Sequence, residues 1–173
     1  AGGATPSDHI SLSKMVELGL ERLTDEKPFF IMCEGGEIDW AAHSQKTFPT
    51  VLSIIEFDNA ISVAYEFYKA HPEETLIVVT ADHETGGVSI GEGKDWRPEI
   101  IDWAMLEKHW FESGEKNVLS YEENREMNKK ALIGWTSSHH TAARVPAFAI
   151  GKGAEKFHGI IENTDIKGKI LGE

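Results

Sequence analysis

Two short apolar segments, each followed by a polar loop of Gly, Asp, Glu and His, constrain the fold of this chain more than any other feature. The first, PFFIMC, leads into EGGEIDWAAH, and the second, TLIVVTA, leads into DHETGG. Runs that are apolar at every position are typical of strands buried on both faces of a sheet. An amphipathic pattern precedes each run, and it predicts one helix from Ser11 or Ser13 to about Lys27 and another from Thr47 to Ala70.

The order helix, strand, loop, helix, strand, loop is that of βαβ units on a parallel sheet, so the predicted fold class is α/β. Ligands of such sheets bind beyond the carboxyl ends of the strands, where the loops 34–45 and 82–87 fall. Residues 145–151 predict a third strand, and the last stretch, NTDIKGKILGE, predicts the start of a short helix.

The remaining segments differ in composition. Residues 1–10 are predicted to be a flexible lead-in, because Gly, Ser and Pro are frequent there. Residues 91–133 contain three tryptophans and many charged side chains, and they predict a helical insertion with surface helices at about 98–112 and 121–132. Residues 11–90 and 134–173 then form a single α/β unit.

Charge and cysteine content exclude several classes of protein. The 17 basic and 29 acidic side chains give the 173-residue chain a net charge of −12, which disfavours nucleic-acid and anionic-membrane partners. The single cysteine, Cys33, excludes an intrachain disulfide and a cysteine-based zinc cluster. No apolar run approaches the ~18 residues of a membrane span, and no signal peptide is visible. The chain starts with Ala, which suits a processed protein, an engineered chain or a piece of a longer one.

Three groups of side chains at the predicted strand ends have the chemistry of metal ligands. Asp39 and His43 are four residues apart, so a helical turn would place both on one face. The alternative for these residues, and for Glu34, is a role as helix-capping, solvated or surface groups. Adjacent Asp82 and His83 can both reach one metal from a loop, although Asp82 can equally cap the next turn.

The third group is the pair His139–His140, of which one can ligate a metal while the other forms only hydrogen bonds. Imidazole together with carboxylate is the ligand preference of zinc in open catalytic sites, and an all-oxygen environment around Glu34 suits magnesium. The other four histidines fall in the termini, at helix ends or in the insertion, and are expected on the surface: His9, His71, His109 and His158.

Taken in order, the motifs EGGEIDWAAH, TADHETGG and HHTAARVPAFAIGKGAEKFHG resemble the C-terminal half of the alkaline phosphatases, from about Ser11 to Ile170. The combination of E-x4-D-x3-H with T-A-D-H and H-T-x4-P is specific. The resemblance implies a parallel-sheet sandwich of the alkaline phosphatase type, present as its C-terminal portion, with the 91–133 insertion over the site.

The resemblance also implies a role for each ligand. Asp39, His43 and His140 correspond to ligands of a first zinc ion, and Asp82 and His83 to ligands of a second. Glu34 corresponds to a magnesium ligand, and Trp40 to a residue that shapes the phosphate pocket. The implied reaction is a two-step hydrolysis of phosphomonoesters through a serine nucleophile, with two metals clamping the attacking and leaving oxygens. A homodimer and a periplasmic or extracellular location are implied as well.

The nucleophile motif of this family, of Asp-Ser-Ala type, does not occur in the sequence. Ser137 and Ser138 lack that context, and Arg144 stands in the wrong place for the phosphate-binding arginine. The chain is therefore expected to lack an N-terminal half and to be inactive alone. The alternatives are a self-contained metal-binding module without catalysis, or a fragment of a related phosphodiesterase, sulfatase or mutase.

The metal assignment changes the meaning of the net charge. The carboxylates of Glu34, Asp39 and Asp82 contribute −3 and two zinc ions contribute +4, which leaves the site at +1 before magnesium is counted. A negatively charged chain can therefore still bind an anionic phosphoester, since bound ions dominate the local charge.

Overall fold

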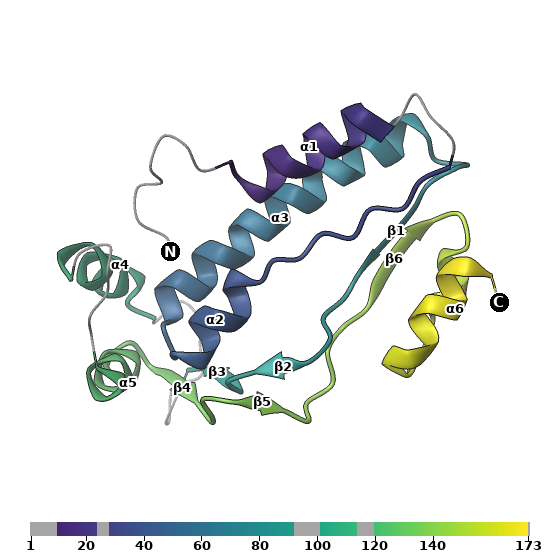
Figure 1. The fold of residues 1–173 in the computed structure, drawn as a ribbon. Coiled ribbons are helices and arrows are strands. Elements are labelled where there is room, and N and C mark those ends of the chain that lie inside the picture. Colours follow the sequence, from purple (N-terminus) through teal and green to yellow (C-terminus); the bar gives the residue numbers. More distant parts are fainter. Residues whose placement is uncertain (1–9, 24–27, 92–100, 114–119, 173) are drawn as a thin grey trace.

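The structure of this chain is a computed structural model, and it describes residues 10–23, 28–91, 101–113 and 120–172. Its helices are α1 (Leu12–Leu23), α2 (Glu37–His43), α3 (Thr47–Ala70), α4 (Trp103–Glu112), α5 (Tyr121–Lys130) and α6 (Ile166–Leu171), with short 3-10 turns at Ala154–Phe157 and Asn163–Asp165 (Figure 1). Its strands are β1 (Leu76–Val79), β2 (Glu84–Thr85), β3 (Val88–Ile90), β4 (Ile133–Trp135), β5 (His140–Thr141) and β6 (Phe148–Gly151).

Most predicted helices are present. The first predicted helix is α1, and its expected extension to Lys27 lies outside the described residues, as does nearly all of the predicted lead-in. The predicted helix over residues 47–70 is α3, with Pro49 in its first turn, where the missing N–H would have no acceptor. The short C-terminal helix is also confirmed as α6. Among the described residues, no helix is long and apolar enough to cross a bilayer.

The strands form a long antiparallel ribbon. The segment with β1, β2 and β3 runs outward, and the segment with β4, β5 and β6 returns beside it, pairing β3 with β4, β2 with β5 and β1 with β6 (Figure 1). The expected α/β class is confirmed, but the expectation of parallel pairing is wrong for the strands that the structure describes. The third predicted strand is β6, and it lies antiparallel to β1, the second, because the segment that begins with β4 pairs back along the segment that ends with β3.

The predicted strand at Phe29–Cys33 is also corrected. This segment is extended and packs against α1 and α3, with the Phe29 and Phe67 ring centroids 6.0 Å apart, but within the described part of the chain it is not hydrogen-bonded into a sheet. The side chains of Phe30 and Met32 are 68% and 80% exposed. A strand that is buried on both faces needs a packed layer on each face. The described residues supply no layer over the face that carries Phe30 and Met32.

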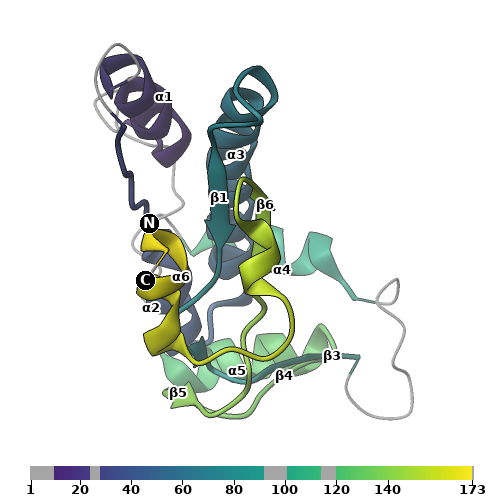
Figure 2. The same cartoon turned by 90° about the vertical axis from the view of Figure 1, so that its right-hand side faces the viewer.

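The best-buried core joins the insertion to the rest of the fold. Ile101, Leu106, Ala131 and Ile133 form a buried cluster against which Phe48, Met105 and Trp135 pack. The two helices predicted in residues 91–133 are present as α4 and α5, although residues 98–100 of the first lie outside the described residues. Figure 2 and Figure 1 together show α4, α5 and the β3–β4 pair gathered near the N-terminal end of α3, close to α2. Residues of α4, and those beside it and α5, therefore form part of a buried core that lies close to α2.

Candidate metal centre

Helix α2 supplies the first two ligand candidates. The predicted loop 34–45 is wrong in part, because residues 37–43 form α2. Asp39 and His43 lie one helical turn apart on one face of this helix, with Asp39 Oδ2 3.4 Å from His43 Nε2. The helix ends directly after His43, and the chain turns there to begin α3. The imidazole of His43 therefore projects from the last turn of α2.

The β2–β5 pair brings in the histidines from the other two motifs. Its register places Glu84 opposite Thr141 and Thr85 opposite His140. The ring of His83, just before β2, stacks on the ring of His140 with centroids 3.4 Å apart and planes 21° from parallel. The Glu84 carboxylate accepts hydrogen bonds from the Thr141 hydroxyl and from the Gly87 backbone N–H, and so ties the two strands together.

The two groups converge on one point. His140 Nε2 lies 3.1 Å from His43 Nε2 and 3.5 Å from Asp39 Oδ1. Ligand atoms of Asp39, His83 and His140 all lie within 4.8 Å of one another. Two ligands of a tetrahedral zinc with bonds of about 2.0 Å are about 3.3 Å apart. The separations of 3.1 and 3.5 Å therefore have the size of the edges of a zinc coordination tetrahedron.

Hydrogen bonds set the tautomers of two of the histidines. The ring nitrogen Nδ1 of His43 lies 2.7 Å from the Ser138 carbonyl oxygen, which can only accept, so Nδ1 carries the proton. The Thr85 hydroxyl donates to Asp39 Oδ1 at 2.5 Å, so its proton is committed there and Thr85 Oγ1 accepts from His83 Nδ1 at 3.2 Å. In both rings the neutral form leaves the Nε2 lone pair for a metal, which is the arrangement typical of ligating histidines.

Asp82 stands at the edge of this cluster. Its Oδ2 atom is 3.3 Å from His83 Nε2, and its side chain is 86% exposed. The family resemblance implies that Asp39 and Asp82 belong to different zinc ions. In the structure the two predicted ligand sets are adjoining parts of one cluster, because the stacked rings of His83 and His140 join them.

Glu34 and Trp40 lie in a neighbouring recess rather than in the converging set. They line a depression of about 380 Å³ at the start of α2 together with Gly36 and Glu37. The Trp40 side chain is 70% exposed, so it is available to contact a ligand in this depression. Within the described residues, Glu34 is not among the three residues whose ligand atoms converge.

Sequence reasoning missed Thr85, which bonds to both Asp39 and His83. A signal for it was present, since residues two apart in an extended segment point to the same side, and Thr85 follows His83 by two. It also missed the Ser138 carbonyl, which no residue pattern reveals because any residue has one. His139 contributes its backbone here, as its carbonyl accepts the Gly86 N–H at 3.0 Å.

The turn between β2 and β3 requires glycine at position 86. Gly86 has a φ of +89°, and a Cβ atom there would lie 2.5 Å from the ring of Trp135. Its carbonyl accepts N–H bonds from Thr136 and Ser137 at 2.9 and 3.0 Å. Close backbone approach at this turn therefore holds the strand of His83 against the segment that leads to His140.

Fold and site together define an α/β protein in which a chain reversal gathers histidines and carboxylates into a set suited to a metal ion. The family model of the alkaline phosphatases matches residues 4–171. The chain belongs to the alkaline phosphatase family, which confirms the resemblance found in its motifs.

Individual relatives agree with this assignment. The chain is 35% identical to alkaline phosphatase 4 of Bacillus subtilis (strain 168), over 90% of this chain and 41% of that protein. The cold-active alkaline phosphatase of the psychrophile Shewanella sp. superposes with a TM-score of 0.77 at 29% identity, covering 97% of this chain and 51% of that one. A variant of the TAB5 alkaline phosphatase with Mg bound in its M3 site superposes with a TM-score of 0.67 at 34% identity, covering 93% of this chain and 40% of that one.

The chain thus spans about two fifths of the length of the curated relatives it matches, with 41% and 42% for two alkaline phosphatases of Bacillus subtilis. Residues that complete the site in those proteins can therefore lie in parts that have no counterpart among these 173 residues.

Proposed function

We propose that this chain is the C-terminal part of a metal-dependent phosphomonoester hydrolase and supplies most of its metal ligands. Family membership supports the reaction class. The single observation that carries the proposal is the convergence of ligand atoms from Asp39, His83 and His140 within 4.8 Å of one another, with His43 in contact. These residues come from three separate motifs, and a structural role for each one alone does not explain why they meet.

We propose that Asp39, His43 and His140 hold a first zinc ion, that Asp82 and His83 hold a second, and that Glu34 binds magnesium. Neutral imidazoles with free Nε2 lone pairs and carboxylates at these separations fit zinc. Glu34, as an oxygen ligand in an open recess beside the cluster, fits magnesium, which keeps several waters. Two such metals supply charge neutralisation to the attacking and leaving oxygens of an in-line phosphoryl transfer.

The residues of this chain would then bind the metal ions and orient the ligands and the substrate. The carboxylates of Asp39 and Asp82 would hold the zinc ions, and the positive charge of those ions would attract a dianionic phosphoester. The Ser138 carbonyl and the Thr85 hydroxyl keep His43 and His83 in the ligating tautomer. Trp40 borders the recess on the side of Glu34 and is positioned to pack against the organic part of a substrate.

The nucleophile is proposed to lie outside these 173 residues. Ser137 and Ser138 lack the Asp-Ser-Ala context of the family nucleophile, and the Ser137 hydroxyl accepts the His139 N–H at 2.9 Å. The exposed apolar side chains of Phe30 and Met32 support a further layer of polypeptide on that side, because a solitary soluble domain rarely leaves such groups together in water.

A comparison of the complete natural protein with the 173-residue chain tests the proposal. The complete protein should hydrolyse p-nitrophenyl phosphate, lose that activity to a chelator and regain it with zinc, while the 173-residue chain should bind zinc without turnover. Robust hydrolysis by the 173-residue chain would place the nucleophile within it. Preference of the complete protein for a phosphodiester or sulfate ester would instead indicate a related hydrolase, and zinc binding with no hydrolysis at all would indicate a metal-binding module.

Two further properties are proposed on the family resemblance alone. The complete protein is proposed to be a homodimer and to act in the periplasm or outside the cell. Light scattering of the purified protein and fractionation of the source cells would test the two statements separately.

A further inference from the structure

The turn that ends α2 is built around a buried glutamine. Lys46 N–H bonds to the Ala41 carbonyl and Gln45 N–H to the Ala42 carbonyl, which is the hydrogen-bond pattern of a Schellman motif. Gln45 occupies its left-handed position, with a φ of 52°, where glycine is usual. Its side chain is only 1% exposed. A long polar side chain at a position that favours glycine indicates that the side chain itself is needed.

The Gln45 side chain binds the segment that leads to His140. Its Nε2 atom donates to the Ser137 carbonyl at 3.0 Å, and the next carbonyl, that of Ser138, accepts from His43 Nδ1 at 2.7 Å. Two adjacent carbonyls are therefore held by two residues from the end of α2. This pair of bonds fixes the distance between the α2 terminus and the strand of His140.

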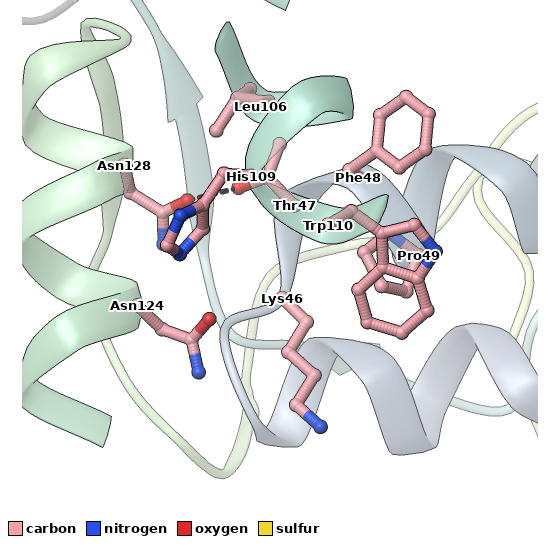
Figure 3. A pocket seen from close by; sticks show the side chains of 9 residues that line it. All are labelled: Lys46, Thr47, Phe48, Pro49, Leu106, His109, Trp110, Asn124 and Asn128. Carbon is pink, nitrogen blue, oxygen red and sulfur yellow. Dashed lines mark hydrogen bonds between the residues drawn. The ribbon is translucent and has the colours of Figure 1, made fainter. Parts of the chain in front are cut away.

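Asn128, a buried residue of α5, fixes Gln45 in turn. Its Nδ2 atom donates to the Gln45 carbonyl at 2.7 Å, and its Oδ1 atom accepts from the Thr47 hydroxyl at 2.6 Å. Figure 3 shows Asn128 and Thr47 facing each other across this contact. The Thr47 oxygen also accepts from Trp135 Nε1 at 3.0 Å. One side chain of the insertion thus binds both ends of the turn between α2 and α3.

We propose that Gln45 and Asn128 are positioning residues of the metal centre, so that helix α5 of the insertion holds His43 and His140 at ligating distance. This inference rests on the proposed function, since it assumes that those histidines bind zinc. Gln45 acts through the Ser137–Ser138 carbonyls, and Asn128 acts through the backbone of Gln45. Neither side chain touches the converging ligand atoms, so each acts through other residues.

The test uses Gln45→Met and Asn128→Ala in the complete natural protein, with Asn124→Ala as the matched control. Asn124 is also buried on α5 one turn earlier, but its side-chain amide donates to the Ser120 carbonyl of its own helix. Methionine keeps the volume of Gln45, whose Oε1 atom has no hydrogen-bond partner among the described residues, so this variant loses mainly the Ser137 bond. Zinc affinity is measured by chelator competition, and ligand geometry by the visible spectrum of the Co²⁺-substituted protein.

Gln45→Met and Asn128→Ala should each weaken zinc binding about 10–100-fold and alter the Co²⁺ spectrum, because groups that orient a ligand have effects of that size. Asn124→Ala should stay within about twofold of the wild type. In a protein that already carries His43→Ala, the Gln45→Met change should reduce zinc affinity less than it does in the wild type. One of the residues that Gln45 positions is then already absent.

Wild-type zinc affinity and an unchanged Co²⁺ spectrum in Gln45→Met would overturn the inference. So would an equal loss in Asn124→Ala, which would indicate a general effect of α5 stability. If Asn128→Ala fails to fold by circular dichroism, Gln45→Met alone decides the question. Absence of zinc binding by the wild-type protein would instead contradict the proposed function, so the two failures are distinguishable.

Discussion

The Nε2 atoms of His43 and His140 lie 3.1 Å apart although the residues are 97 positions apart in the sequence. With His43 Nδ1 donating to the Ser138 carbonyl, the lone pair of His43 Nε2 faces the other ring. Two such nitrogens repel unless a proton or a metal ion lies with them. A metal ion bound by both nitrogens would take the place of the hydrogen bond that a proton on His140 Nε2 makes here, and the following prediction tests whether zinc does so.

Zinc should raise the melting temperature of the 173-residue chain, and Asp39→Ala combined with His43→Ala should abolish the shift due to the first site. A ligand that binds only the folded state stabilises it by about 2.7 kcal/mol at a hundredfold excess over its dissociation constant. Differential scanning fluorimetry with and without zinc measures the shift. His158→Ala, which changes an exposed histidine outside the cluster, is the control and should leave the shift intact. No shift in the unmodified chain would mean that this part of the site cannot hold zinc unaided.

Thr85→Val should weaken zinc binding about tenfold or more while Thr85→Ser retains it. The hydroxyl donates to Asp39 and accepts from His83, so its loss frees both ligands to adopt other orientations. Valine keeps the shape and the branched side chain, so thermal stability without metal should change little. Isothermal titration with zinc compares the two variants, and equal affinities for valine and serine would contradict the role assigned to this hydroxyl.

Gly86→Ala should destabilise the fold more than Gly159→Ala does. Both glycines have positive φ values, of +89° and +83°, so both substitutions incur the backbone penalty of about 1–2 kcal/mol for a left-handed residue. Only at position 86 would the new Cβ meet a ring, that of Trp135 at 2.5 Å, whereas nothing lies within 4 Å at position 159. Urea unfolding followed by tryptophan fluorescence measures the free energy of unfolding of both variants. Equal decreases would contradict the close approach of residue 86 to the Trp135 ring.

The start of α5 should lose stability in acid. The Ser120 backbone N–H and hydroxyl bind the Glu123 carboxylate and hold its pKa below the ordinary value of 4.5. A carboxyl group with a lowered pKa in the folded state stabilises that state above its unfolded pKa, and the contribution disappears as pH falls through the folded pKa. Melting temperatures followed by circular dichroism from neutral pH to about pH 3 test this.

Glu123→Gln should remove that part of the acid dependence, and Glu122→Gln, which deletes a neighbouring exposed charge outside the capping box, should preserve it. The same acid dependence in both variants would mean that other carboxylates cause it.

Most of the helices follow from the sequence because they depend on local pattern. The spacing of Asp39 and His43 gives a shared face if the segment is helical, and α2 supplies that helix within the predicted loop 34–45. The apolar periodicity that predicts α3 is likewise local, and so is the composition that predicts the insertion helices. The motifs that resemble the alkaline phosphatases also predict the family, which the comparisons confirm, because they preserve residue types at fixed spacing.

Strand direction and ligand convergence were decided only by the tertiary structure. An apolar run such as Phe29–Cys33 predicts a buried strand, but its partner is not encoded in the run itself, and the segment remains extended and partly exposed. The antiparallel return of β4, β5 and β6 depends on where α4 and α5 pack. The roles of Gln45 and Thr85 arise from hydrogen bonds between segments distant in sequence or across a turn, and local pattern holds no information on such distances.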